Sequence, residues 1–366
     1  MIPIYKPYLP KKSLEYAHDA VTSTWISSQG EYLERVTDKL KTLLKAPHVQ
    51  LVNTGTAATH LVARGLLHKH PTVRKLFVPN NVYVAAWNPF CYDRKLELVP
   101  VDADINTWNF DIRELKNKIE DNCAVLAVHN IGNIINVPKL REELPPSTVF
   151  LEDSCEGFMG TYDNKYAGTQ SLLASFSFFG NKIITSGEGG AVVTDDKEVF
   201  EFINILQGQG QSKDTKYLHV ELGYNYRMTN VQAALLLGQL EELSVILKRK
   251  KNIFSYYRKE LSAIESVTLQ QVEKNTIHSN WMMGIRIKGN PSSEKICRFL
   301  KDKGIDSRPM FYPMSFHKHL KLYANPHNER VATLLSKECV ILPSFPDLSV
   351  EECEYIVNSI KEYVLS

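Results

Sequence analysis

The chain has 366 residues, of which 43% are hydrophobic and 23% charged. A chain of this length can bury one large core and a second, smaller one, so we expect two domains. Its 43 basic and 41 acidic residues leave a net charge of +2, which gives no reason to expect nucleic acid or a membrane surface as a partner. An anionic ligand would therefore need a local binding site.

The cysteines and the N-terminus both favour a cytoplasmic protein. The six cysteines lie far apart, with no CxxC pair and no spacing typical of metal ligands. We interpret them as reduced thiols and expect no metal site. The N-terminus has no apolar signal region, and no hydrophobic run reaches the length of a membrane span.

The first half of the chain alternates helices and strands. We expect helices at 12–23, 31–45, 57–63 and 83–90, and strands at 49–53, 76–79, 96–101, 124–129 and 148–153. Strands that alternate with helices are typical of a mostly parallel sheet covered on both faces. Ligands of such sheets bind beyond the carboxyl ends of the strands, where Asn53, His129 and Asp153 fall.

The pattern changes near residue 240. Before it we expect a helix near 197–206, a polar glycine-rich loop, and a long helix from 231 that is capped by Thr229 or Asn230. After it come strands near 266–271 and 281–288 and helices near 293–303 and 351–363. We therefore predict a large domain over 1–240 and a smaller C-terminal α+β domain over 241–366. The basic run at 248–251 is interpreted as a solvated helix face.

Two segments have patterns that could form a binding site. At 49–63 a short strand is followed by Thr54-Gly55-Thr56 and a helix, whose free backbone N–H groups and dipole favour phosphate, although many α/β turns look alike. At 175–194 the chain breaks at Gly180, presents Lys182 and returns through a glycine-rich stretch. This lysine is either a solvated residue in a hairpin or an amine free to form a Schiff base, desolvated by Phe176, Phe178 and Phe179.

Asp153 closes an apolar strand, and Glu156 follows three residues later. An acidic residue at a strand end commonly caps a helix, but it can also serve chemistry. Glu156 could complete a capping arrangement or point the same way as Asp153.

Seven segments together resemble one family. In chain order they are 53–58 (NTGTAA), 78–79 with 83–85 (VP, YVA), 152–156 (EDSCE), 177–182 (SFFGNK), 187–190 (GEGG), 223–230 (GYNYRMTN) and 304–309 (GIDSRP). They resemble the DegT/DnrJ/EryC1/StrS-type sugar aminotransferases, pyridoxal-phosphate enzymes of fold type I. Within that family the similarity is greatest to the perosamine and viosamine synthases, which are nucleotide-sugar 4-aminotransferases. The resemblance implies an α/β fold with a mostly parallel mixed sheet and a smaller C-terminal domain.

The resemblance implies roles for the residues of these segments. Lys182 would hold the cofactor through its amine and carry the proton between carbon atoms. Asp153 would pair with the pyridine nitrogen and keep it protonated. The phosphate would be held by N–H and hydroxyl donors of Thr56, Ala57 and Ser177.

Other matched positions surround the cofactor or the substrate. Tyr83 would stack on the cofactor ring, and Glu156 would lie near it. Asn225 would reach the phosphate from a neighbouring subunit, so the resemblance implies a homodimer with shared sites. His129 would contact the sugar, although Asn-Ile-Gly follows it where relatives carry an aromatic residue and glycine. Arg308 would meet a nucleotide phosphate, or would equally be a surface residue beside a proline.

The implied reaction moves an amino group from L-glutamate, which becomes 2-oxoglutarate, to C4 of a nucleotide-linked 4-keto-6-deoxyhexose. The product would be a 4-amino-4,6-dideoxy sugar nucleotide of the UDP- or dTDP-viosamine or GDP-perosamine type. Alternatives are a C3-specific aminotransferase and a dehydratase of the same fold, which carries His at the position of Lys182. A regulator without turnover would carry a DNA-binding segment, for which we expect no room at either terminus. A structural α/β protein without cofactor is the remaining alternative.

Overall fold

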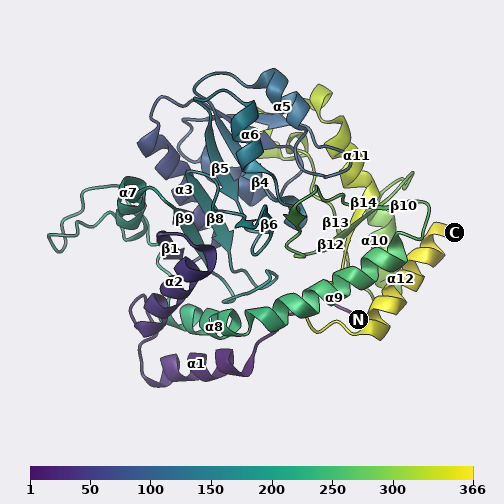
Figure 1. Cartoon of the computed structure of the whole chain (residues 1–366), viewed down its shortest axis with the longest axis horizontal. Coiled ribbons are helices and arrows are strands. Elements are labelled where there is room, and N and C mark those ends of the chain that lie inside the picture. Colours follow the sequence, from purple (N-terminus) through teal and green to yellow (C-terminus); the bar gives the residue numbers. More distant parts are fainter. Residues whose placement is uncertain (366) are drawn as a thin grey trace.

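A seven-stranded mixed sheet forms the centre of the chain between residues 48 and 194 (Figure 1). The structure is a computed structural model that describes residues 1–365. In spatial order the strands are β1 (His48–Val52), β9 (Gly190–Thr194), β8 (Leu173–Ser177), β5 (Val149–Asp153), β4 (Ala124–Val128), β2 (Lys75–Pro79) and β3 (Glu97–Val101). Only β9 runs antiparallel to its neighbours, so the mostly parallel α/β sheet expected from the sequence is confirmed.

Helices cover both faces of this sheet, so its central strands consist mainly of buried apolar residues. Alternate residues of β9 enter different cores: Val192 packs in the core that includes α3, whereas Ala191 and Val193 pack in the core that includes α2 and α8. The helices of this part are α1 (Lys11–Thr22), α2 (Glu31–Leu44), α3 (Gly55–Lys69), α4 (Asn88–Cys91), α5 (Ile112–Lys118), α6 (Val137–Glu143), α7 (Lys197–Gln207) and α8 (Asn230–Glu241). Every residue of β4 and β5 is buried.

A four-stranded antiparallel sheet lies wholly after residue 241, as the expected α+β part does. Its order is β10 (Val267–Leu269), β12 (Met283–Ile287), β14 (Cys339–Leu342) and β13 (Arg308–Pro309). Four helices accompany it: α9 (Leu243–Leu261), α10 (Ser293–Asp302), α11 (Arg330–Glu338) and α12 (Val350–Leu365). No helix within residues 1–365 combines the length and the apolar character that crossing a membrane requires.

Strand pairing is among the contacts that join the parts of the chain on either side of residue 240. Ile2 pairs with Ile305, so the N-terminal segment lies against the C-terminal part. A small third sheet joins β11 (Thr276–Ile277) to β6 (Thr161–Tyr162) and β7 (Lys165–Tyr166). The domain boundary at 240/241 stays a prediction.

The helix expected at 83–90 is two short pieces, η1 (Val84–Ala86) and α4, and Pro89 lies in the first turn of α4, where its missing N–H costs no helical hydrogen bond. Thr229 is the N-cap of α8 and forms a capping box with Gln232. The polar loop after α7 projects from the rest of the molecule (Figure 1), and Tyr217 and Leu222 on it are strongly exposed.

The expectation of a solvated basic face at 248–251 is wrong at one residue. Lys248 and Lys251 of α9 are exposed, but Lys250 is fully buried. Lys250 stands four residues after Ile246 and seven before Tyr257, which places it on the apolar face of the helix. The position of a lysine in the helical period, rather than the local charge run, decides its burial.

Candidate active site

Three candidate residues meet at the carboxyl edge of the large sheet. Asp153 ends β5 and Ser177 ends β8, while His129 follows β4. Because these strands run parallel in adjacent positions, their ends lie together, as expected for ligand sites in α/β sheets.

The N-terminus of α3 lies against the end of β8. Thr54 caps the helix, and its side chain accepts a hydrogen bond from the N–H of Ala57 at 3.0 Å. A Cβ atom on Gly55 would lie 2.7 Å from Cβ of Ser177, so only glycine permits this approach. Thr56 is exposed in this first turn. Backbone N–H groups and the Ser177 hydroxyl therefore share one small region, which suits a phosphate.

Lys182 does not lie in a solvated hairpin. Its side chain is 13% exposed, and its Nζ atom lies 3.9 Å from Oε1 of Glu156. The aromatic ring over the amine is Trp281, with its centre 4.0 Å from Nζ. The rings expected to desolvate the lysine lie elsewhere: Phe176 and Phe178 pack into the core, and Phe179 is 45% exposed.

Asp153 is buried and closes a turn rather than capping a helix. Its Oδ1 atom accepts a hydrogen bond from the N–H of Cys155 at 3.0 Å. Residues 155–159 form turns, so the helix-cap interpretation does not hold. One carboxylate oxygen is thereby fixed at the sheet edge, which determines the orientation of the group.

Glu156 points toward Lys182 and not into a cap. Its Oε2 atom accepts a hydrogen bond from the N–H of Ile131 at 2.7 Å, while Oε1 faces the amine. Burial raises the pKa of this carboxyl to about 7, against the opposing effects of Lys182 and the Ile131 N–H. Near neutral pH this acid can therefore hold or release a proton beside the lysine.

His129 is fully buried, which differs from the expected contact with a sugar. Its Nδ1 atom accepts a hydrogen bond from the N–H of Ile135, and Nε2 lies 3.1 Å from Oε1 of Glu152. Burial raises the pKa of Glu152, but hydrogen bonds from His129 and from the N–H groups of Gly168 and Gln170 hold it below its usual range. Both ring nitrogens of His129 are thus engaged within the protein, where they brace the end of β5.

Three further candidates are exposed. Tyr83 is 59% exposed, with its ring centre 5.9 Å from that of Phe311. Asn225 is exposed, and its backbone carbonyl accepts a hydrogen bond from the side chain of Asn53 at 3.3 Å. Arg308 forms an ion pair with Asp306 and donates to the carbonyl of Ser307. Within residues 1–365, these contacts do not involve Lys182.

The profile of the DegT/DnrJ/EryC1/StrS aminotransferase family matches residues 7–361. The chain belongs to this family. The GDP-perosamine synthase of Escherichia coli O157:H7 is 35% identical, and the match covers 99% of this chain and 98% of that protein. The GDP-perosamine synthase of Vibrio cholerae is 33% identical over 99% of both chains. The expected family is therefore confirmed, and the protein is a pyridoxal-phosphate-dependent sugar aminotransferase.

Two solved structures have the same fold as this chain, although their sequence identity to it is lower. A GDP-4-keto-6-deoxymannose-3-dehydratase with bound GDP-perosamine superimposes with a TM-score of 0.91 at 23% identity, over 98% of this chain and 100% of that one. A putative sugar aminotransferase from Streptococcus pneumoniae gives 0.91 at 24% identity, over 100% and 99%. Both likenesses confirm the fold of the aminotransferase.

The residues at the sheet edge fit pyridoxal phosphate. The aminotransferase places a lysine amine, a buried carboxylate at a strand end and a helix N-terminus beside a serine at the same edge. A side chain at position 55 would collide with Ser177 and would prevent this close approach of the helix to the strand end. This donor set suits a group with an aldehyde, a basic ring nitrogen and a phosphate.

Sequence reasoning missed the residues that surround Lys182 from other parts of the aminotransferase. The hydroxyl of Tyr5 donates to the carbonyl of Lys182 at 2.7 Å, and Nε1 of Trp281 donates to the carbonyl of Asn181 at 2.8 Å. The hydroxyl of Ser279 donates to the carbonyl of Glu156 at 2.6 Å. No local pattern in the sequence links these residues to Lys182, because the contacts span about a hundred residues or more.

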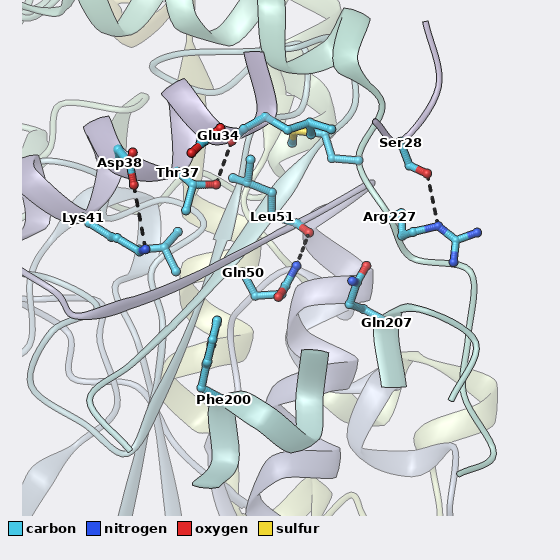
Figure 2. Close-up of a pocket in the computed structure, with 13 residues that line it drawn as sticks. Ser28, Glu34, Thr37, Asp38, Lys41, Gln50, Leu51, Phe200, Gln207 and Arg227 are labelled. Atoms are coloured by element: carbon cyan, nitrogen blue, oxygen red, sulfur yellow. Dashed lines mark hydrogen bonds and ion pairs between the residues drawn. The ribbon is translucent and has the colours of Figure 1, made fainter. Parts of the chain in front are cut away.

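A cavity of about 400 Å³ lies away from this site, between α2, β1 and α7 (Figure 2). Polar groups on its lining bond to one another: Nε of Arg227 donates to Oγ of Ser28, and Lys41 lies 3.8 Å from Asp38. None of the residues matched to the cofactor lines this cavity. A smaller space beside Lys182 is lined by Cys155, Phe158 and Ile184.

Proposed function

We propose that this aminotransferase moves an amino group from L-glutamate to C4 of GDP-4-keto-6-deoxymannose, giving GDP-perosamine. The observation that carries the proposal is the amine of Lys182, which lies at the carboxyl edge of the sheet beside Glu156 and free of backbone acceptors among the described hydrogen bonds. The choice of sugar nucleotide is supported by three relatives named GDP-perosamine synthase, at 30–35% identity over nearly their whole lengths.

When bound, pyridoxal phosphate supplies an aldehyde carbon and a ring that withdraws electrons. The amine of Lys182 would hold the group and would accept and return a proton during amino transfer. The carboxylate of Asp153 would pair with the ring nitrogen and keep it protonated. The first turn of α3, at Thr56 and Ala57, would hold the phosphate together with the hydroxyl of Ser177.

The remaining matched residues complete the proposed site. Tyr83, which is exposed after β2, would pack on the face of the cofactor ring. Glu156 exchanges a proton near Lys182, which its raised pKa of about 7 permits. Arg308 is the proposed contact for a nucleotide phosphate, for which it would have to leave Asp306.

We further propose that two copies of the chain form a homodimer with shared sites. The exposed side chain of Asn225 stands on a segment whose backbone is tied to Asn53. It would contact the phosphate in a second copy. The projecting loop after α7 carries exposed apolar side chains, which favour burial against another subunit.

Lys182 also discriminates between reactions. The family resemblance implies that the dehydratases of this fold carry His at the position of Lys182, and a histidine cannot hold an aldehyde as a primary amine does. The lysine therefore favours amino transfer over dehydration.

The experiment is a set of incubations with glutamate and a panel of 4-keto-6-deoxy sugar nucleotides. The panel contains GDP-linked manno and dTDP- and UDP-linked gluco sugars, and the position of amination is read by NMR. We expect conversion of the GDP-linked sugar with the amine at C4 and release of one 2-oxoglutarate for each amine transferred. Amination at C3, preference for another nucleotide, or no exchange of amine with any amino acid would each contradict the proposal.

A further inference from the structure

The amine of Lys250 is held in the interior by the protein backbone. Its Nζ atom donates to the carbonyl of Trp281 at 2.7 Å and to the carbonyl of Ser344. The rings of Tyr5 and Phe254 lie 5.5 and 5.3 Å from it. No carboxylate pairs with Lys250 in the described part of the chain. Burying an amine without a partner costs free energy, so these two hydrogen bonds stabilise the positions of Lys250, Trp281 and Ser344 relative to one another.

Two neighbours of Lys250 also bond to the turn that carries Lys182. The hydroxyl of Tyr5 donates to the carbonyl of Lys182, and the indole of Trp281 donates to the carbonyl of Asn181. Two consecutive carbonyls of the turn are thereby fixed from outside it. The indole ring of Trp281 also covers the Lys182 amine on one side.

We propose that Lys250, Trp281 and Tyr5 form a clamp that positions the amine of Lys182. These three positioning residues come from α9, from the segment before β12 and from the N-terminus. Lys250 holds the backbone of Trp281 in place by a hydrogen bond to its carbonyl. The indole N–H of Trp281 in turn holds the turn at Asn181, and its ring restricts the side chain of Lys182. The inference rests on the proposed role of Lys182, and it assigns a role in the site to residues that touch no substrate.

The same segment also positions the acid that faces Lys182. Ser279, two residues before Trp281, donates its hydroxyl proton to the carbonyl of Glu156. The backbone N–H of Ser279 donates to the carbonyl of Gly132, next to the residue that bonds the Glu156 carboxylate. The segment that carries Trp281 therefore contacts the backbone around both members of the amine–carboxyl pair, whose separation is 3.9 Å.

The test compares Trp281→Phe with Tyr257→Phe. Trp281→Phe keeps an aromatic ring but removes the N–H that bonds Asn181. Tyr257 is a matched control on α9, since it is fully buried and its hydroxyl donates to the carbonyl of Pro343, beside Ser344. Pyridoxal phosphate is added to cofactor-free protein, samples are reduced with borohydride at intervals, and the labelled lysine is mapped by mass spectrometry. Visible circular dichroism of the bound cofactor and kcat and KM for glutamate are also measured.

We expect Trp281→Phe to slow the labelling of Lys182 about tenfold, because a displaced amine reaches the aldehyde less often. The circular dichroism of the bound cofactor should change, and kcat should fall while KM for glutamate stays within about twofold. Tyr257→Phe should lower the melting temperature but label Lys182 at the wild-type rate. Lys250→Met should resemble Trp281→Phe; if it does not fold, Tyr5→Phe supplies the second variant.

Wild-type labelling rates and circular dichroism in Trp281→Phe would overturn the clamp. The same holds if Tyr257→Phe slows labelling as much as Trp281→Phe does, since the effect would then follow stability alone. A wild-type protein that carries the label on a lysine other than Lys182 would instead overturn the proposed function, so the two failures are distinguishable.

Discussion

Lys182 and Lys250 are both largely buried, and their surroundings differ in kind. Lys250 lies on a helix, is fully buried, and donates to two backbone carbonyls. Lys182 lies in a turn beyond β8, keeps 13% of its side chain exposed, and faces a carboxyl group and an aromatic ring. An amine whose N–H groups are satisfied by the backbone supports structure, whereas one beside an acid is available for chemistry.

The two regions also differ in which group has a shifted pKa. Burial lowers the pKa of Lys250 well below 10.5, with no acid to oppose the effect in the described structure. Around Lys182 the adjustable group is the acid, since burial raises the pKa of Glu156 to about 7. A proton can therefore move within the Lys182 region near neutral pH, while the Lys250 region has no partner with which to exchange one.

Removing the amine of Lys182 should lower turnover more than any other change. Lys182→Ala should lower turnover by at least about 10³-fold, because covalent capture and proton transfer both depend on the amine. Pyridoxal phosphate should still bind through the first turn of α3 and Ser177, but borohydride should leave no covalent label. Lys251→Ala, at an exposed position on α9, is the control and should keep full activity. A Lys182→Ala protein that is active and still takes the covalent label would show that Lys182 is not the reactive lysine.

Neutralising the Asp153 carboxylate at the end of β5 should give the second largest fall in turnover. In Asp153→Asn the side-chain oxygen can still accept the hydrogen bond from Cys155, so the turn should remain folded. The charge is lost, and we expect kcat to fall about 10²-fold with the covalent label on Lys182 retained. Asp153→Ala, which also loses the turn contact, should in addition lower the melting temperature. An Asn variant with wild-type kcat would show that the charge at this position is not needed.

The order of elements and the family were accessible from the sequence, because a strand such as β4 is apolar throughout and turns such as Gly187 to Gly190 have distinctive composition. Lys182, Asp153, Ser177 and Thr56 could be selected from those motifs. The direction of the Glu156 side chain could not, because capping and chemistry require the same residue type at the same spacing.

The surroundings of Lys182 lay beyond sequence reasoning for a physical reason. The ring that covers its amine belongs to Trp281, about a hundred residues away, while the nearby Phe179 points outward. Burial of Lys250 was readable in principle from its spacing to Ile246 and Tyr257, but the flanking charges at 248–251 obscured it. Local composition identifies reactive residues more readily than the residues that position them.

The Glu156 carboxyl provides a pH-dependent test of the reactive region. Its pKa rises from 4.5 to about 7 on folding, so the folded protein binds more protons than the unfolded chain in this window and loses stability as pH rises. Glu156→Gln, which mimics the protonated acid, should make cofactor-free protein more stable above pH 7 by up to about 3 kcal/mol. The difference should vanish below pH 4.5. Urea unfolding at pH 4.5, 6 and 8 measures it, and a difference that grows toward low pH would contradict the assignment.

Lys250→Met tests the structural region and should give the smallest effect. Methionine matches the lysine in length but leaves the carbonyls of Trp281 and Ser344 without donors, so we expect a loss of about 2 kcal/mol in unfolding free energy. Because the folded pKa of Lys250 is lowered, the unfolded chain binds the extra proton below pH 10.5, and wild-type stability rises with pH in that window. The deficit of the variant should therefore be larger at pH 9 than at pH 7.

The matched control for this last test is Lys251→Met, at the next residue of α9, where the side chain is exposed. It should change the free energy of unfolding by less than about 0.5 kcal/mol at either pH. Equal losses at positions 250 and 251, or a deficit at 250 that shrinks as pH rises, would mean that the buried amine is not held as its two carbonyl contacts indicate. Lys250 would then no longer stand in contrast to Lys182, and the difference between them would reduce to depth of burial alone.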